Sequence, residues 1–356
     1  NLDGMDVEVL SANVNQAGGL DIDLANKKLY VTAAGSIKRF DLDGGNRETI
    51  LNKISPKFVR LDLDSGYIYW SQEDKIMRSD LNGKNRASIV KDLEYTAGLD
   101  IHNNEIYWTD EYGGIRKSDI AGNNIKRVIY TIFDPLIVKL DKVNRKLYFS
   151  YLLFYGGGPT GGMIARSDLD GSNVEDLFPV DFYVDGIEFD YANGKIYFTD
   201  FGNEEVKRAN FDGSNVEVVS SGQRPSGIDI DTINGRVIWT EPVIGRIRKS
   251  RLDGSNARTI VRNTESPFKV DIDLDNRKLY WTDQGEGTLK KSDLGGNDIE
   301  TFYYGEPNPL SNHQVDLEEV QVHSWNWDVD DVSDRNEESN VFYHTNLIHD
   351  FMNDLG

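Results

Sequence analysis

Tyr280-Trp281-Thr282-Asp283 is the clearest copy of a short motif that recurs along this chain of 356 residues. Seven copies begin, in order, at Tyr30, Tyr69, Tyr107, Tyr148, Tyr197, Ile238 and Tyr280, and the successive spacings are 39, 38, 41, 49, 41 and 42 residues. A period of about 40 residues with strand-like content is typical of a propeller or another closed array of repeats. The motif therefore indicates a fold more directly than it indicates a function.

Each repeat contains the same sequence of strand and turn signals. An alternating run such as Gly227-Ile228-Asp229-Ile230-Asp231 predicts a strand. A tight turn and the motif strand follow, and then a second turn whose glycine supplies a positive φ. This second turn recurs around Gly44, Gly83, Gly122, Gly171, Gly213, Gly254 and Gly296. Each period thus encodes four short antiparallel strands, so we expect an all-β protein, a β-propeller of seven four-stranded blades, with six blades as the alternative.

The two ends of the chain differ from the repeats. We expect residues 5–10 to close the ring beside the strands around 268–292, which would leave residues 298–304 redundant or displaced. Residues 306–356 hold twelve Asp and Glu against the single Arg335, and residues 339–356 have the apolar spacing of an amphipathic helix. The sequence therefore predicts a propeller over residues 1–305 and an acidic C-terminal extension over 306–356 that ends in a short helix.

Composition excludes several classes of function. The chain has no cysteine, which rules out a disulfide framework and a Cys-ligated zinc site. Its net charge of −21 argues against binding to nucleic acid or to anionic membranes. The apolar runs are too short to span a membrane, and the sequence opens inside a repeat, so we expect a processed or trimmed chain.

An aspartate stands seven residues before the motif in every copy, at Asp23, Asp62, Asp100, Asp141, Asp190, Asp231 and Asp273. These carboxylates could form an acidic ring that coordinates a cation such as Ca²⁺ at the propeller axis. They could instead accept main-chain hydrogen bonds within each blade. A residue repeated in every blade usually serves what every blade shares, so we expect the structural role and no cofactor, while a cation in the central channel stays open.

The motif, the upstream aspartate and the Asp-Gly-Ser-Asn turn (Asp170 to Asn173) together resemble the YWTD β-propeller family, the class B repeats of low-density-lipoprotein receptors, over residues 1–305. The resemblance implies an extracellular or cell-surface setting and a protein ligand. Propellers of that family typically have six blades and Cys-rich neighbours, whereas this chain has seven motif copies and no cysteine.

A second resemblance involves the last residues of the chain. Residues 339–356 resemble the start of the peptidase domain of fungalysin-type metallopeptidases, through Asn340-Val341-Phe342-Tyr343, Asn346 and Ile348-His349-Asp350. None of the five histidines lies in a His-Glu-x-x-His arrangement, which would be needed to hold the zinc of such an enzyme. The chain is therefore not expected to be a peptidase by itself.

Residues that differ between repeats are better candidates for a binding site. In a propeller, the loops that follow the motif strand and the loops that join blades emerge on one face, which we call the loop face. Aromatic and charged side chains on these loops resemble a recognition surface, although some of the aromatics could instead cap the core. The candidate ligand-binding residues are Glu94, Tyr95, Glu111, Tyr112, Phe133, Tyr151, Phe154, Tyr155, Phe182, Tyr183, Phe201, Glu204, Arg224 and Phe268.

One predicted loop is unlike the others. Tyr151 to Gly162 accounts for the longest spacing and combines an apolar half with a glycine-rich half. It could fold over the central channel as a lid for a small ligand or present an exposed apolar patch. No catalytic constellation emerges elsewhere: His102 is the only histidine within the repeats, two residues from Asp100.

The leading hypothesis is an extracellular binding module that recognises a protein or peptide on the loop face, with a basic partner favoured by the acidic charge. One alternative is a propeller enzyme, a hydrolase or lyase acting in the central channel. Another is a non-catalytic accessory domain of a secreted metallopeptidase.

Overall fold

The computed structural model of the chain describes residues 19–303, apart from residues 34, 73, 94–97, 111–113, 131–134, 156–157, 182 and 298. The chain divides into two units, Asn1–Glu306 and Pro307–Gly356, and every described residue belongs to the first. The predicted terminal helix at 339–356 and the predicted closing strand at 5–10 lie outside the described residues.

The described residues form seven antiparallel sheets of four strands each, and each sheet is one blade. Blade 1 consists of β1 (Leu20–Asp23), β2 (Lys28–Ala33), β3 (Ser36–Asp41) and β4 (Glu48–Asn52). Blade 2 consists of β5 (Val59–Asp62), β6 (Tyr67–Gln72), β7 (Lys75–Asp80) and β8 (Ala87–Val90). Blade 3 consists of β9 (Leu99–His102), β10 (Glu105–Asp110), β11 (Gly114–Asp119) and β12 (Lys126–Ile129). Blade 4 consists of β13 (Pro135–Asp141), β14 (Lys146–Tyr155), β15 (Gly158–Asp168) and β16 (Glu175–Val180). Blade 5 consists of β17 (Ile187–Asp190), β18 (Lys195–Asp200), β19 (Glu205–Asn210) and β20 (Glu217–Ser221). Blade 6 consists of β21 (Ile228–Asp231), β22 (Arg236–Glu241), β23 (Arg246–Arg251) and β24 (Arg258–Val261). Blade 7 consists of β25 (Pro267–Asp273), β26 (Lys278–Asp283), β27 (Thr288–Asp293) and β28 (Glu300–Tyr303).

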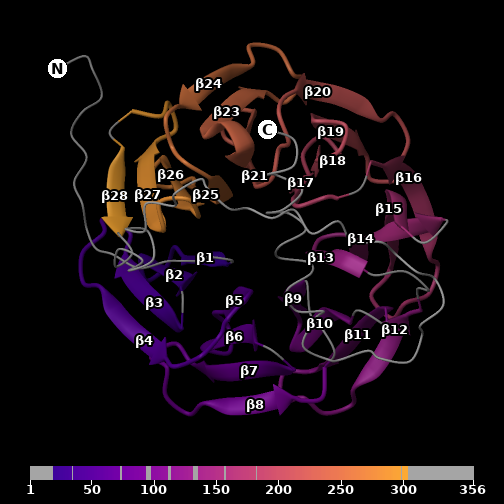
Figure 1. Cartoon of the computed structure of the whole chain (residues 1–356). Helices are drawn as coiled ribbons and strands as arrows, with labels where there is room; N and C mark the ends of the chain where they lie inside the picture. The colour runs from indigo at the N-terminus through magenta and orange to yellow at the C-terminus, as the bar shows by residue number, and fades with distance from the viewer. Residues whose placement is uncertain are drawn as a thin grey trace, which may run out of the picture. The chain divides into compact units, whose positions relative to one another are not determined.

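The blades are arranged in a ring, with the first strand of each blade at the centre and the fourth at the rim (Figure 1). The predicted seven-bladed propeller is therefore confirmed. The described helical structure is the single 3₁₀ turn η1 (Pro242–Ile244), and no helix in the described part of the chain is long and apolar enough to span a membrane.

The predicted displacement of residues 298–304 is wrong. Strand β28 pairs with β27 as the fourth strand of blade 7, so this blade takes all four strands from a continuous piece of chain. The reason is the turn before it, where Gly296 has a φ of 84° and so repeats the positive-φ glycine turns of the other blades. A complete blade 7 needs no strand from the other end of the chain.

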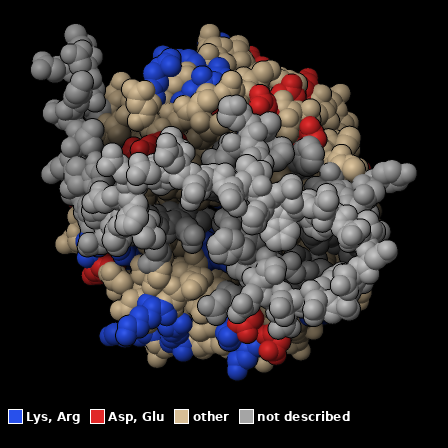
Figure 2. Space-filling view, in the orientation of Figure 1, with Lys and Arg blue, Asp and Glu red and all other residues tan. Residues whose placement is uncertain are grey.

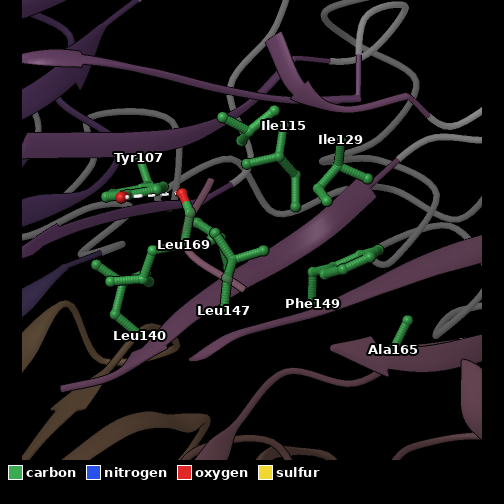
Figure 3. Packing of buried hydrophobic residues seen from close by; sticks show 10 residues of the cluster. Tyr107, Ile115, Ile129, Leu140, Leu147, Phe149, Ala165 and Leu169 are labelled. Carbon is green, nitrogen blue, oxygen red and sulfur yellow. Dashed lines mark hydrogen bonds between the residues drawn. The ribbon is translucent and has the colours of Figure 1, made fainter. Parts of the chain in front are cut away.

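The motif tyrosines join neighbouring blades. In six blades the tyrosine hydroxyl donates a hydrogen bond to a main-chain oxygen of the next blade, and the acceptors for Tyr30, Tyr69, Tyr107, Tyr148, Tyr197 and Tyr280 are Leu81, Ile120, Leu169, Phe211, Leu252 and Leu42. Figure 3 shows one of these bonds, from Tyr107 to Leu169, beside the buried side chains that pack blade 3 against blade 4. The aromatic position of the motif therefore serves the interface between blades.

The hydroxyl of the Thr or Ser at the third motif position binds the main chain of the inner strand. In six copies it accepts a hydrogen bond from the main-chain N–H group just before or at the start of the inner strand: the acceptors Thr32, Ser71, Thr109, Thr199, Thr240 and Thr282 bind the N–H groups of Gly19, Phe58, Gly98, Gly186, Gly227 and Lys269. Because a buried N–H group without an acceptor is costly, this explains why the third motif position is Thr or Ser.

The upstream aspartates close the turn between the first and second strands. Asp23, Asp141, Asp190, Asp231 and Asp273 each accept hydrogen bonds from the main-chain and side-chain N–H groups of the asparagine three residues later. Asp62 accepts the N–H of Ser65 in the same way. In these six blades the carboxylates lie at the turns, so they do not form a ring around the axis.

Asp100 does not belong to this set. The prediction from the sequence that Asp100 is equivalent to the other six aspartates is wrong. Asp100 pairs with Tyr107 across the hairpin, whereas in blade 1 the residue opposite the motif tyrosine is Asp21, and Asp23 lies at the turn. The turn of blade 3 is two residues shorter and consists of Asn103 and Asn104, with φ angles of 50° and 61°. His102 therefore occupies the turn position of blade 3.

The predicted loop from Tyr151 to Gly162 is mostly an extension of blade 4, so the prediction of a loop is wrong. Strands β14 and β15 continue to Tyr155 and from Gly158, and they remain paired along this length. Leu152 is fully buried, and the Tyr151 hydroxyl donates a 2.8 Å hydrogen bond to Asp176 of the outer strand β16. The apolar half of the segment pairs with its glycine-rich half, for example Leu152 with Gly162 and Leu153 with Gly161, and the glycine content concealed this pairing.

Candidate functional site

The fourth position of the motif fixes the loops of the loop face. Asp200 accepts main-chain N–H groups from Asp181, in the link from blade 4 to blade 5, and from Asn203, in the loop after β18. Asp283 does the same in blade 7, with Glu265 and Ser266 in the link and Glu286 in the loop. Both carboxylates are fully buried. The two kinds of loop therefore meet at one end of each blade, as the sequence predicts.

Four of the predicted site residues lie together on this face, and we call them the loop-face cluster: Tyr183, Phe201, Glu204 and Arg224. The rings of Tyr183 and Phe201 meet edge to face at 6.4 Å between centroids. The Arg224 guanidinium lies 5.6 Å from the Phe201 centroid and 3.8 Å from Glu204. Glu204 is exposed and the two rings are half-buried, so the cluster offers both aromatic surface and charge to a partner.

The main chain holds the loop-face cluster in place. The N–H of Phe201 donates to the carbonyl of Tyr183 at 3.1 Å, and the N–H of Gly222 donates to the carbonyl of Glu204 at 2.7 Å. The cluster thus joins the loop of blade 5 to the links on both sides of that blade. Loop side chains positioned by a rigid scaffold are a common basis for recognition.

Two further predicted residues that the structure describes, Tyr151 and Phe268, lie outside this cluster. Tyr151 is bound internally to Asp176, as described above. Phe268 lies at the start of blade 7, with the Lys269 ammonium 5.0 Å from its ring centroid. Glu94, Tyr95, Glu111, Tyr112, Phe133 and Phe182 lie outside the described residues, and so do the side chains of Phe154 and Tyr155.

The central channel carries a ring of charged side chains that the sequence reasoning missed. In all seven blades the residue of the inner strand that pairs with the first motif residue is charged. These residues form the axial ring: Asp21, Arg60, Asp100, Lys139, Glu188, Asp229 and Asp271. The alternating runs contain this signal, because the axial residue lies two positions before the turn residue on the same strand face.

Three carboxylates of the axial ring connect adjacent inner strands. Asp21 accepts the N–H groups of Ile22 and Leu61, both at 2.9 Å. Asp100 binds Ile101 and Leu140, and Asp229 binds Ile230 and Ile272, in the same pattern. An inner strand is the open edge of its sheet, so its outward N–H groups need acceptors. These carboxylates supply them and join blade 1 to 2, 3 to 4 and 6 to 7.

The charges in the channel strongly affect one another. Burial and then the Asp21 and Glu188 carboxylates raise the pKa of Asp271 to about 7. Burial and then Asp271 raise the pKa of Asp229 well above its usual value. Burial lowers the pKa of Lys139, but its partner Glu188 and Asp100 more than offset this, so the net shift is upward. The channel is therefore a coupled set of charges.

The described side chains offer no built metal site. No group of three or more His, Asp or Glu side chains among them is arranged to hold a metal ion. His102, the only histidine within the repeats, lies at the turn of blade 3. Its burial has the largest effect on its pKa, which it lowers, and the nearby charges of Lys142 and Arg145 lower the pKa further.

Comparison with known sequences gives distant relatives. No family model matches the chain. The vitellogenin receptor of Solenopsis invicta is 24% identical over 170 residues, which cover 35% of this chain and 10% of the receptor. The cueball protein of Drosophila yakuba is 27% identical over 113 residues, which cover 28% of this chain and 18% of that protein. The match therefore spans only a small part of each relative.

Comparison with solved structures supports the architecture. A chain from a nidogen/laminin complex is 20% identical with a TM-score of 0.52, covering 67% of this chain and 96% of that one. A hydrazine synthase chain of Kuenenia stuttgartiensis is 13% identical with a TM-score of 0.67, covering 83% of this chain and 99% of that one. At such identities the structures show the fold alone. Together with the receptor and cueball matches, they support a propeller of the YWTD type. The resemblance of residues 339–356 to a fungalysin-type peptidase stays a prediction.

Proposed function

We propose that the propeller is a non-catalytic binding module that recognises a protein or peptide on its loop face. The loop-face cluster carries this proposal, because Tyr183, Phe201, Glu204 and Arg224 lie side by side on loops held by the buried Asp200 and by the main-chain bond from Gly222 to Glu204. Aromatic and arginine side chains of this kind dominate the binding energy of many protein interfaces. Similarity to a receptor and to a chain of a nidogen/laminin complex supports a protein ligand.

We further propose an extracellular or cell-surface setting and a partner with a basic segment. The described loops of this face hold seven Asp and Glu (Asp74, Asp92, Asp181, Asp185, Glu204, Glu265 and Glu286) against five Lys and Arg (Lys53, Lys57, Lys91, Arg224 and Arg262). The excess of two carboxylates is small, so shape and aromatic contact should matter more for affinity than net charge. Electrostatic complementarity would then act mainly on the association rate.

Catalysis in the channel receives less support from the geometry. Asp21, Asp100 and Asp229 accept main-chain hydrogen bonds, and Glu188 is paired with Lys139. Four of the five axial carboxylates are thus committed to joining blades, which gives them a structural use.

A peptide library displayed on phage and selected on the intact chain tests the proposal. Selected peptides should bind the double variant Phe201→Ala/Glu204→Lys at least about tenfold more weakly than the parent chain. The control is Val174→Ala, an exposed side chain in the turn after β15, at the other end of the blades. The control should bind the peptides as tightly as the parent chain does. If the double variant Phe201→Ala/Glu204→Lys also binds them as tightly, the assignment of this face is refuted.

A further inference from the structure

Blade 6 departs from the other blades at the tyrosine of the motif. Ile238 replaces it, and no hydroxyl reaches the next blade from this position. The main-chain oxygen of Leu294, the counterpart of the six tyrosine acceptors, instead accepts a hydrogen bond from the Lys249 ammonium. The shorter side chain leaves a pocket of about 380 Å³ between blades 6 and 7. Its lining residues are Asp231, Asn234, Arg236, Ile238, Lys249, Arg277, Leu294 and Gly295.

This pocket, which we call the blade 6 pocket, lies at the turns between first and second strands, at the opposite end of the blades from the loop face. Residues Arg236 and Ile238 are two apart on β22 and so share one face of the sheet, and Lys249 lies opposite Ile238 on β23. A volume of this size is within the range of small-molecule sites in proteins.

The walls carry like charges at two positions where several other blades carry ion pairs; blade 3 also has like charges there, but its Lys117 is paired with Glu105. Arg236 lies opposite Arg251, whereas the equivalent pairs in blades 1 and 4 are the salt bridges Lys28–Asp41 and Lys146–Asp168. Lys249 lies opposite Arg258, whereas the equivalent pairs in blades 1, 4 and 5 are Arg39–Glu48, Arg166–Glu175 and Arg208–Glu217. Like charges directly opposite each other destabilise a sheet. Blade 6 has therefore lost two internal counterions on one face.

The carboxylates near the pocket do not replace these counterions. Asp231 is held by both terminal nitrogens of Arg277, at 2.9 and 2.6 Å, and Asp293 is occupied by the turn that contains Gly295 and Asn297. Arg236 forms no hydrogen bond or ion pair with any residue that the structure describes. Burial, then Arg258 and Arg236, lower the pKa of Lys249, although Asp293 and Asp231 act against this. At the rim where Figure 1 labels β23 and β24, Figure 2 shows Lys and Arg side chains gathered together.

We propose that the blade 6 pocket binds a small oxygen dianion, of the phosphate monoester or dicarboxylate class, through Arg236 and Lys249. The two cations match two negative charges, and Ile238 supplies an apolar wall beside them. Arginine and lysine are the side chains that bind such groups with charge-assisted hydrogen bonds. A bound dianion supplies the two counterions that Asp and Glu supply in blades 1 and 4.

Isothermal titration calorimetry at constant ionic strength tests this, with inorganic phosphate and succinate as separate probes and acetate as the monoanion. The intact chain should bind phosphate or succinate with one site and bind acetate far more weakly. The probe that binds identifies the class. Arg236→Gln and Lys249→Gln should each weaken binding by about tenfold or more. Lys195→Gln is the matched control, because Lys195 is the equivalent of Arg236 in blade 5 and lies opposite Asn210.

Two further variants separate loss of the site from loss of folding. Ile238→Tyr restores the motif and should fill the pocket, so that binding is lost while the thermal midpoint is kept. Arg258→Glu, at an exposed position, restores the counterion of Lys249 and should raise the thermal midpoint without ligand and weaken binding. No saturable heat with either dianion at millimolar concentration, or full binding by Ile238→Tyr, would overturn the proposal.

Discussion

The hydroxyl of Tyr280 donates a 2.8 Å hydrogen bond to the main-chain oxygen of Leu42, 238 residues away in the sequence. The same interaction joins five other pairs of neighbouring blades, so this bond closes the ring between blade 7 and blade 1. Lys291 supports it by donating to the carbonyl of Asp43. The propeller is thus closed by side chains of the repeated motif, with every described blade built from consecutive strands.

Tyr280→Phe should destabilise the propeller by about 1–3 kcal/mol, because a buried carbonyl loses its hydrogen-bond donor. Urea denaturation followed by tryptophan fluorescence measures this. Tyr130→Phe is the control, since Tyr130 is 79% exposed and should change the stability little. Equal stability of the two variants would show that the hydroxyl does not hold the ring closed.

Asp283→Ala should cost about 3 kcal/mol or more, since the buried carboxylate accepts from Glu265, Ser266 and Glu286 and its loss leaves those donors and Lys290 without it. Hydrogen exchange should speed up at residues 264–266 and 284–287 before it does elsewhere. Asp275→Ala, at an exposed turn position, is the control. Unchanged exchange in these two segments would contradict the role of Asp283 as the anchor of both loops.

Asp271 should make stability depend on pH in a defined direction. Its folded pKa, about 7, lies above the unfolded value near 4, so the folded state binds the proton more tightly. The stability that proton binding to Asp271 contributes to the folded state is therefore fully present below pH 4 and is lost as pH rises through 7. Asp271→Asn should be more stable than the parent chain at pH 8, on the order of 1 kcal/mol after allowance for water in the channel, and the difference should vanish near pH 4. A difference independent of pH would exclude this titration.

The two-residue turn of blade 3 requires positive φ at Asn103 and Asn104. Asn104→Gly should be neutral or slightly stabilising, because glycine adopts this conformation freely. Asn104→Val should cost about 1–2 kcal/mol, because a β-branched side chain strains the left-handed region. Thermal denaturation of the two variants compares them directly, and similar midpoints would contradict the turn assignment.

The blades could be predicted from the sequence because the signals that define them are local. The period, the alternating runs and the glycine turns each act within a few residues, and the motif at Tyr280 repeats them in one register. The closure of the ring could not be read in this way, because it depends on contacts such as Tyr280–Leu42 between distant parts of the chain. The outer strand of blade 7 does have a local signal, the turn at Gly296, but the expected closure by residues 5–10 leaves no place for it.

Counting along the sequence failed where a turn changed length. Asp100 stands seven residues before its motif like the other aspartates, yet the shorter turn of blade 3 moves it to the axial ring. The axial ring itself was visible as a charge in every alternating run, but the repeat of the turn aspartate two residues later concealed it. Of the candidate site, the sequence supplied Tyr183, Phe201, Glu204 and Arg224, and only the fold shows that these four lie together.

Hydrogen exchange on a complex with a peptide selected on the intact chain tests the central claim most directly, because it shows which face is covered. Binding on the loop face should slow exchange at residues 183–186, 201–204 and 222–227 and leave the turns at 24–27, 191–194 and 232–235 unchanged. Protection of those turns instead, with no change around Phe201 and Glu204, would contradict the assignment of the binding face.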